Sequence, residues 1–289
     1  MDDQHDLILS IQKKFPKLSK GQKRIAQFII DHYDKAAFMT ASKLGSQTNV
    51  SESTVVRFAN SLGFEGYPQL QRSLQDIIKT KLTTVQRVEM GKEYSSDMEV
   101  VEKIMKSDME NVRQTIEGIN YNEIEKVIDE MMKAERIYII GLRSSKSLAD
   151  FLGFYLSLIL GNVSMVGFGI SDIYEQMLRI SEKDLLISLS FPRYSSRTIE
   201  VTKYAKEQGA KVVAITDSAI SPIAGIADHY LTAKSSMASF VDSLVAPLSL
   251  LNAIIVAIGM REKRDITEYF NKLETIWEKY NIYDGREKV

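Results

Sequence analysis

Apolar residues recur at helical spacing through the first 83 residues of the chain. Ser19, Thr40 and Ser51 precede three of these apolar rows, where a hydroxyl side chain can cap a helix. We therefore expect an all-α bundle of helices with short connections. Five helices are predicted. The first ends before Pro16, the second begins after Ser19, and the third covers 41–47. The fourth runs from Ser51 to Leu62 and stops at Gly63, and the fifth begins near Pro68.

The third and fourth predicted helices fit a helix-turn-helix unit, in which a turn of three or four residues joins two short helices. Arg and Asn suit bidentate contacts with guanine and adenine, so the polar outer face of the second helix is a candidate DNA-reading surface. A plain helical bundle with polar exposed faces explains the pattern about as well. The expected shared core is Ala41, Leu44, Val50, Val55 and Phe58, and the candidate DNA-binding residues are Ser51, Ser53, Thr54, Arg57 and Asn60.

The next segment is helical in pattern and acidic, with 12 Asp and Glu against 6 Lys and Arg over 91–135. We expect it to connect two domains, with a hinge near 90–96, and therefore divide the chain into domains at 1–83 and 125–289 joined by a connector at 84–124. Apolar residues at helical spacing predict that the connector packs on something, with its methionines as core filler. These residues are Met98, Val101, Ile104, Met105, Met109, Val112 and Ile116.

The hydrophobic period changes at Arg136, where short apolar runs begin to alternate with helical segments. Nearly continuous apolar strands between helices predict a mostly parallel sheet covered on both faces, a three-layer α/β/α domain. The fold class is therefore α/β, preceded by the all-α bundle. Ligands in such sheets bind at the carboxyl ends of the strands. The apolar runs lie at 137–140, 163–166, 185–189, 212–215 and 230–232.

Hydroxyl side chains cluster where two of these strands lead into helices. Free N–H groups and the positive dipole end of a helix N-terminus suit a phosphate, and Arg193 or Arg197 could add a charge-assisted contact. Simple helix capping is the competing interpretation. The candidate ligand-binding hydroxyls are Ser144 and Ser145 after the first strand, and Ser190, Ser195, Ser196 and Thr198 after the third.

Composition excludes several kinds of site. The chain has 289 residues and no cysteine, so disulfides and thiolate metal sites are ruled out. His5, His32 and His229 lack metal-ligand spacing, and neither a P-loop nor a full dinucleotide fingerprint is present. We therefore expect no metal and no cofactor.

The N-terminus has no secretory signal, and the most apolar segment, 244–260, is too short to span a bilayer. We expect a cytoplasmic protein without membrane attachment, in which 244–260 is a buried helix. Net charge is +4 over residues 1–90 and −5 over the remainder, so the basic end is the candidate for a polyanionic partner.

Two stretches resemble the RpiR/MurR family of bacterial transcriptional regulators: NVSESTVVRFANSLGFEGYPQLQRSL at 49–74 and SFPRYSSRTIEVTKYAKEQGAKVVAITDS at 190–218. The resemblance covers nearly the whole chain. It implies an N-terminal helix-turn-helix domain and a C-terminal SIS (sugar isomerase) domain whose serine-rich loops bind a phosphosugar that alters DNA binding. SIS loops commonly carry glycine soon after the first serine. This chain has Phe191 and Pro192 there, which predicts a longer and more rigid loop.

The expected function is therefore a DNA-binding regulator of carbohydrate metabolism genes that senses a phosphorylated sugar. The expected partners are operator DNA, a small phosphosugar effector and further copies of the chain in a homodimer or tetramer, because paired half-sites need two recognition helices. The alternative is a sugar-phosphate isomerase, which requires a base within reach of the substrate. The conceivable bases are Glu175, Glu200 and His229.

Overall fold

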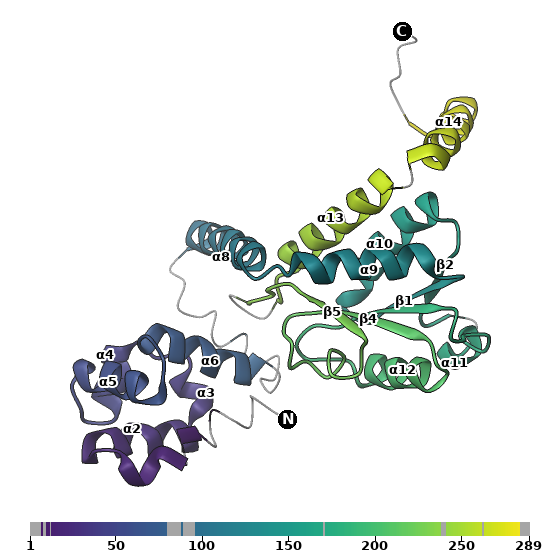
Figure 1. Cartoon of the computed structure of the whole chain (residues 1–289). Helices are drawn as coiled ribbons and strands as arrows, with labels where there is room; N and C mark the ends of the chain where they lie inside the picture. The colour runs from purple at the N-terminus through teal and green to yellow at the C-terminus, as the bar shows by residue number, and fades with distance from the viewer. Residues whose placement is uncertain are drawn as a thin grey trace. The chain divides into compact units, whose positions relative to one another are not determined.

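The computed structural model describes residues 7, 10, 11, 13–79, 88, 96–169, 171–237, 241–261 and 263–283 (Figure 1). They fall into two compact units, Met1–Met105 with Met237–Asp242, and Lys106–Ser236 with Ser243–Val289. The first has one hydrophobic core and the second has one on each face of a sheet.

The helices of the first unit begin where the sequence places their caps. Ser19 forms a capping box with Gln22, and Thr40 accepts a hydrogen bond from the backbone of Lys43. Gly63 ends the fourth predicted helix with a φ of 103°, which a side chain would oppose. The elements are the 3₁₀ helix η1 (Phe15–Lys17) and the α-helices α2 (Lys20–Asp31), α3 (Tyr33–Ala36), α4 (Ala41–Gln47), α5 (Glu52–Leu62) and α6 (Tyr67–Lys79).

The predicted all-α bundle is confirmed in the part of the chain that the structure describes. The first predicted helix is described only at residues 7, 10, 11, 13 and 14, which are all helical. The single helical turn α3 was not predicted from the sequence. The side chains of Ile77 and Ile78 and residues 90–95 of the predicted hinge lie outside the described residues.

Two helices open the C-terminal half, α8 (Asp97–Glu117) and α9 (Tyr121–Lys133). The α8 helix is held by polar side chains: Asn111 Nδ2 donates to the Ser236 carbonyl at 3.0 Å, and Asn111 Oδ1 accepts from the Ser236 N–H at 3.2 Å. Thr115 Oγ1 accepts from the Lys234 N–H at 2.9 Å. We call these three bonds the α8 clasp. The prediction that the methionines of this segment fill a core is wrong, because Met98, Met105 and Met109 are 62–78% exposed.

The second unit contains a parallel sheet with strand order β2-β1-β3-β4-β5. Helices cover both faces, as the alternating pattern predicted, and the sheet separates two layers of helices (Figure 1). The strands are β1 (Ile137–Gly141), β2 (Val163–Val166), β3 (Leu185–Leu189), β4 (Lys211–Thr216) and β5 (His229–Thr232); the helices between them are α10 (Ser145–Ile159), α11 (Ile173–Gln176) and α12 (Ser196–Glu207).

Strand residues alternate between the two cores. Ile137 and Ile139 of β1 face α9, α10 and the later helix α13 (Val245–Arg261), whereas Tyr138 and Ile140 face α11 and α12. Because successive side chains of a strand point to opposite faces, a fully buried strand must be apolar throughout. This explains the continuous apolar runs of the sequence.

The segment expected as a buried helix is α13, which buries Leu251, Ile254 and Ile258 along one side. A last helix, α14 (Lys263–Tyr280), follows it. No helix among the described residues combines the length and apolar character that crossing a bilayer requires.

Asp228 joins α12, β4 and β5, and it supplies a pH-dependent part of the stability. Its carboxylate accepts from Lys206 Nζ at 2.6 Å and from the Val212 N–H at 2.9 Å. Burial raises the pKa of Asp228, but these bonds outweigh it and hold the pKa below its ordinary value. The depressed pKa contributes stability that is present above the unfolded pKa and is lost as pH falls through the folded one.

We therefore expect the free energy of unfolding to fall below about pH 4, the ordinary range of an aspartate. Asp228→Asn should cost about 1–3 kcal/mol at neutral pH and flatten the acid limb of the stability curve. Chemical denaturation at pH 7 and across the acid range measures both effects. An equally steep acid limb in the variant would assign the acid sensitivity to other carboxylates.

Candidate functional site

The helix-turn-helix unit consists of α4, a four-residue turn and α5. Leu44, Val55 and Phe58 are fully buried, and Ala41 and Val50 pack around them, which confirms the predicted shared core. A Cβ on Gly45 would lie 2.9 Å from the Val50 carbonyl oxygen, so glycine permits the turn to close against α4. Asn49 in the turn has a φ of 52°, a conformation that Asn tolerates better than most residues.

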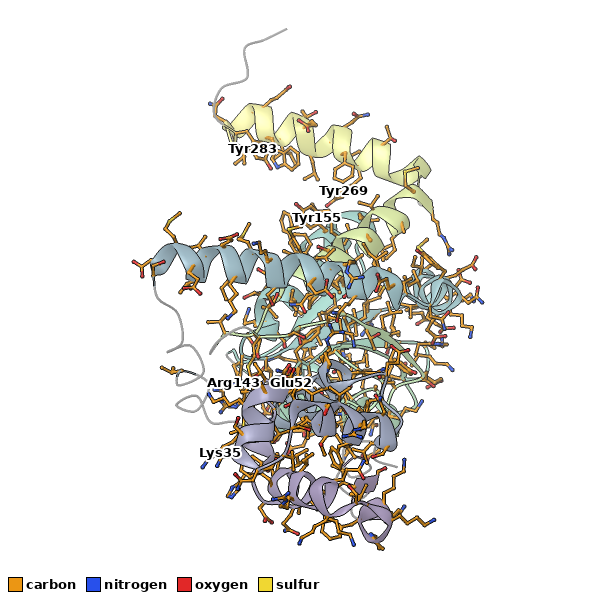
Figure 2. All side chains as sticks on the ribbon, turned by 90° about the vertical axis from the view of Figure 1, so that its left-hand side faces the viewer. Lys35, Glu52, Arg143, Tyr155, Tyr269 and Tyr283 are labelled. Carbon is orange, nitrogen blue, oxygen red and sulfur yellow. The ribbon has the colours of Figure 1, made fainter. Side chains whose placement is uncertain are left out.

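The candidate DNA-binding residues share the outer side of α5, which begins at Glu52 (labelled in Figure 2). Ser51, Ser53, Arg57 and Asn60 are exposed, and Thr54 is half-buried. Ser51 Oγ lies 2.9 Å from both Ser53 Oγ and Thr54 Oγ1, and Arg57 Nε donates to the Ser53 carbonyl at 3.3 Å. These bonds fix a hydroxyl cluster at the helix N-terminus, where phosphate contacts are favoured.

The two serine-bearing loops leave neighbouring strands, because β1 and β3 are paired and Gly141 lies opposite Leu189. From there the chain diverges: α10 leads outward to β2 on one face of the sheet, and α12 leads to β4 on the other. This reversal of strand order is the topological switch point at which open α/β sheets bind ligands. The apolar pattern predicted that both loops follow strands, but not that these two strands are adjacent.

The first loop is tightly constrained at its base. A Cβ on Gly141 would lie 2.5 Å from the Ser145 carbonyl oxygen and 2.9 Å from Ala149 Cβ, so only glycine lets α10 start this close to β1. Arg143, labelled in Figure 2, has a φ of 57°, which is uncommon for a residue with a side chain. Ser144 is exposed and Ser145 is buried.

The second loop is fixed by a buried aromatic ring. Phe191 is 4% exposed and belongs to the core that β3 shares with α10, which gives a physical reason for the rigid loop expected from the sequence. Tyr194 donates a hydrogen bond of 2.8 Å to Asp217 Oδ1 at the end of β4. Arg193 is exposed, whereas Arg197 pairs with Asp172 at 3.1 Å and Glu200 at 3.4 Å and lies over the Tyr174 ring. Arg197 therefore has a structural role.

The hydroxyls of this loop have unequal surroundings. Ser195 is the N-cap of α12 and accepts from the Thr198 N–H at 3.3 Å, as the capping interpretation requires. Ser190 is buried and Ser196 is exposed. Thr198 is fully buried, and its Oγ1 is one of two buried side-chain atoms without a hydrogen-bond partner among the described residues. Buried hydroxyls normally find partners, so this one marks a position that a ligand atom could complete.

The three conceivable isomerase bases are already engaged in structural contacts. Glu175 completes the capping box of α11 with Asp172, and Glu200 pairs with Arg197. His229 Nδ1 lies 2.7 Å from Glu123 Oε1. Burial raises the pKa of Glu123, but its hydrogen bonds, above all that with His229, hold the pKa below the ordinary value. Among the described residues, no group of three or more His, Asp or Glu could hold a metal ion.

A pocket of about 420 Å³ that the sequence did not predict lies at the carboxyl ends of β4 and β5. Its lining does not include the candidate serines, but Asp217 lines it and receives the Tyr194 hydrogen bond, so the pocket adjoins the second loop. The other polar lining residues include Glu123, Ser218, Thr232 and Lys234. Lys234 also carries one of the bonds of the α8 clasp.

Comparison with known proteins matches both halves of the chain. Residues 5–81 match the model of the helix-turn-helix domain of the rpiR family, and residues 130–257 match the model of the SIS domain. An uncharacterised HTH-type transcriptional regulator of Haemophilus influenzae is 26% identical over 90% of this chain and 92% of its own length. The HTH-type transcriptional regulator HexR of Pseudomonas aeruginosa is 23% identical over 93% of this chain and 94% of its own length.

Solved structures agree with the fold. The sugar isomerase domain of an RpiR transcription factor from Sphaerobacter thermophilus superposes with a TM-score of 0.58 at 26% identity, covering 60% of this chain and 97% of that one. NanR of Vibrio vulnificus, solved in complex with ManNAc-6P, superposes with a TM-score of 0.59 at 18% identity, covering 96% of this chain and all of that one. With a helix-turn-helix unit, a SIS fold and regulators as full-length relatives, the chain belongs to the RpiR family of transcriptional regulators.

Proposed function

We propose that the chain regulates carbohydrate metabolism genes by binding operator DNA through α5 and a phosphorylated sugar through the loops that follow β1 and β3. The observation that carries the sensing half is the buried, unpartnered hydroxyl of Thr198 at the N-terminus of α12. Phosphate oxygens are suitable acceptors for that hydroxyl and for the free N–H groups of the helix. The NanR complex with ManNAc-6P supports the same ligand class here.

We assign the phosphosugar contacts to the hydroxyls at the switch point and to one arginine. Ser145, Ser190 and Thr198 are the buried members of the set, and Ser195 combines binding with its capping role. Arg193 supplies a charge-assisted contact in this proposal. The complete set is Ser144, Ser145, Ser190, Arg193, Ser195, Ser196 and Thr198.

Thr198→Val tests the sensing site because it removes the hydroxyl and keeps the shape of the side chain. We expect the ligand-free stability to stay within about 1 kcal/mol of the wild type, since no protein hydrogen bond is lost. Effector binding should weaken by about 1.5–3 kcal/mol, the loss of a hydrogen bond to a charged group. A thermal-shift screen over a panel of sugar phosphates measures both, because a ligand of the native state raises its stability by mass action.

Thr202→Val is the matched control on the same helix. Thr202 is equally buried, but its Oγ1 lies 2.7 Å from Ser188 Oγ and donates to the Thr198 carbonyl. The control should lower the ligand-free stability and keep most of the effector shift. If Thr198→Val keeps the full shift with the effector that stabilises the wild type, the phosphate does not bind at this helix end.

The DNA-binding half assigns base and phosphate contacts to Ser51, Ser53, Thr54, Arg57 and Asn60. Arg57→Ala should weaken specific operator binding by about 1–3 kcal/mol if the guanidinium contacts a base edge. Fluorescence anisotropy with specific and scrambled duplexes at fixed salt measures the loss. Arg179→Ala, which removes an exposed arginine outside the helix-turn-helix unit, is the charge-matched control. Equal weakening on both duplexes would limit Arg57 to a phosphate contact.

We further assign residues 1–83 to the DNA-binding domain, 84–124 to the connector and 125–289 to sensing and dimerisation. The separate hydrophobic cores and the extents of the two family models support this division. A homodimer or tetramer acting in the cytoplasm places two α5 helices on half-sites about 34 Å apart. Effector and DNA must then change each other's affinity by the same factor.

A further inference from the structure

The α8 helix is exposed on its apolar side. Met98, Val101, Met105, Met109 and Ile116 are 57–78% exposed, and Val112 between them is half-buried. Spacings of three and four residues place all six side chains on one side of the helix. We call this row the α8 stripe. A contiguous apolar surface of this size is uncommon on a free protein surface and is typical of an interaction site.

The exposure does not come from an unattached helix, because the flank of α8 beside the stripe is fixed by the α8 clasp. Asn111 and Thr115 are 2% and 7% exposed, so the helix rests on the flank that carries these two residues, while the apolar row and the charged side both face outward. In a protein that folds as a single chain, the apolar side of a helix is normally the buried one. The stripe therefore lies outside the contacts that hold α8 and can bind another surface.

The sequence of the stripe repeats every 11 residues. Met98, Val101 and Met105 correspond to Met109, Val112 and Ile116, while Glu102 corresponds to Arg113. An 11-residue repeat has about 3.67 residues per turn, close to the period of a straight helix, so the apolar row runs almost parallel to the axis. Two such rows can remain in contact along the length of α8, about 30 Å at 1.5 Å per residue.

The repeat also makes the stripe complementary to itself in the antiparallel direction. A two-fold axis at Ser107 brings Met98 opposite Ile116 and Met105 opposite Met109 of a second copy, since these positions are equally distant from residue 107. The same axis brings Glu102 opposite Arg113, within one residue, on the same flank of the stripe. Arg113 also pairs with Glu110 and Glu117 of its own helix, so the contact with Glu102 sets direction more than affinity.

We infer that the α8 stripe is the seam on which a second copy of this chain docks, with the two α8 helices antiparallel. The inference rests on the proposed function only in that a regulator of paired half-sites needs two copies. To the proposed homo-oligomer it adds the surface through which two copies bind, which lies on the connector, and the antiparallel direction in which the two α8 helices pair.

The first test replaces the centre of the stripe. Met105→Lys with Met109→Lys should weaken self-association by at least tenfold, because four ammonium groups would meet in the apolar seam. Sedimentation velocity over a concentration series measures the change, and circular dichroism verifies folding. Phe168→Lys with Leu178→Lys is the matched control, since both residues are 77% exposed away from α8. Unchanged association of the α8 variant, or a wild type that remains monomeric, would overturn the inference.

Cysteine cross-linking tests whether the two α8 helices are antiparallel. It has no background from native thiols, because the chain has no cysteine. A disulfide requires Cα atoms about 4.4–6.8 Å apart. In the antiparallel pair, Met98→Cys protomers should cross-link to Ile116→Cys protomers and not to each other, since the two copies of residue 98 lie about 27 Å apart along the axis. Strong cross-linking of Met98→Cys alone would indicate a parallel pair and contradict the proposal.

The outcomes separate this inference from the proposed function. Loss of association in the lysine variant together with preserved effector-induced thermal shifts supports the seam and leaves the sensing site intact. Conversely, loss of the effector shift in Thr198→Val with unchanged cross-linking supports the sensing site and leaves the proposed seam unaffected.

Discussion

Phe58→Ala is expected to unfold the N-terminal helices while the sheet domain remains folded. Phe58 is the largest fully buried side chain of the first unit, and it extends from α5 into the helix-turn-helix core. Truncating a buried phenylalanine costs about 3–5 kcal/mol, a large part of the stability of a small domain. The structure keeps this core separate from the two cores that flank the sheet. Differential scanning calorimetry should show an early transition that the wild type lacks.

DNA binding should be lost in the same variant, whereas effector stabilisation of the remaining transition should persist. Phe168→Ala is the control, because Phe168 is 77% exposed and its removal leaves no cavity. A single transition at lowered temperature, with effector binding and DNA binding lost together, would mean that the two domains unfold as one cooperative unit.

Gly141→Ala is expected to distort the loop that follows β1, which we propose to bind the effector, and to cost about 1–3 kcal/mol of stability, the usual cost of overpacking. The new methyl group would lie 2.5 Å from the backbone oxygen of Ser145, which cannot rotate away as a side-chain atom could. The start of α10 must therefore shift, and Ser144 and Ser145 shift with it. Thermal unfolding measures the cost, and the effector-induced shift measures the effect on sensing.

Gly167→Ala provides the comparison, since a Cβ at Gly167 meets nothing within 4 Å. It should leave both quantities unchanged. If Gly141→Ala lowers stability but leaves the effector shift intact, the β1 loop supports the fold without contacting the ligand.

Most of the fold could be predicted because its signals are local. Caps such as Ser19 and Thr40, the stop at Gly63 and the apolar runs of β1 and β3 each involve residues a few positions apart. The same holds for the core of the helix-turn-helix unit, which follows from helical spacing. The positions of the two serine loops at strand ends were predictable for the same reason.

Features that depend on distant residues could not be predicted. The pairing of Arg197 with Asp172 and of Tyr194 with Asp217 joins side chains more than 20 positions apart. The buried, unpartnered Thr198 hydroxyl depends on packing around α12, which residue type does not reveal. For α8, periodicity predicted an apolar side, but not that this side would be exposed while a neighbouring flank is held through Asn111.

The α8 clasp has a mechanical consequence. Its bonds hold α8 at Asn111 and Thr115, about 6 Å apart along the axis, while Asp97 lies about 21 Å farther along the same helix. The helix is therefore a lever whose short arm lies at the clasp, just after β5, and whose long arm runs to the N-terminal end of α8 at Asp97. A rearrangement that moved Lys234 by 1 Å relative to Ser236 would swing Asp97 by about 3–4 Å, as the 1.5 Å rise per residue implies.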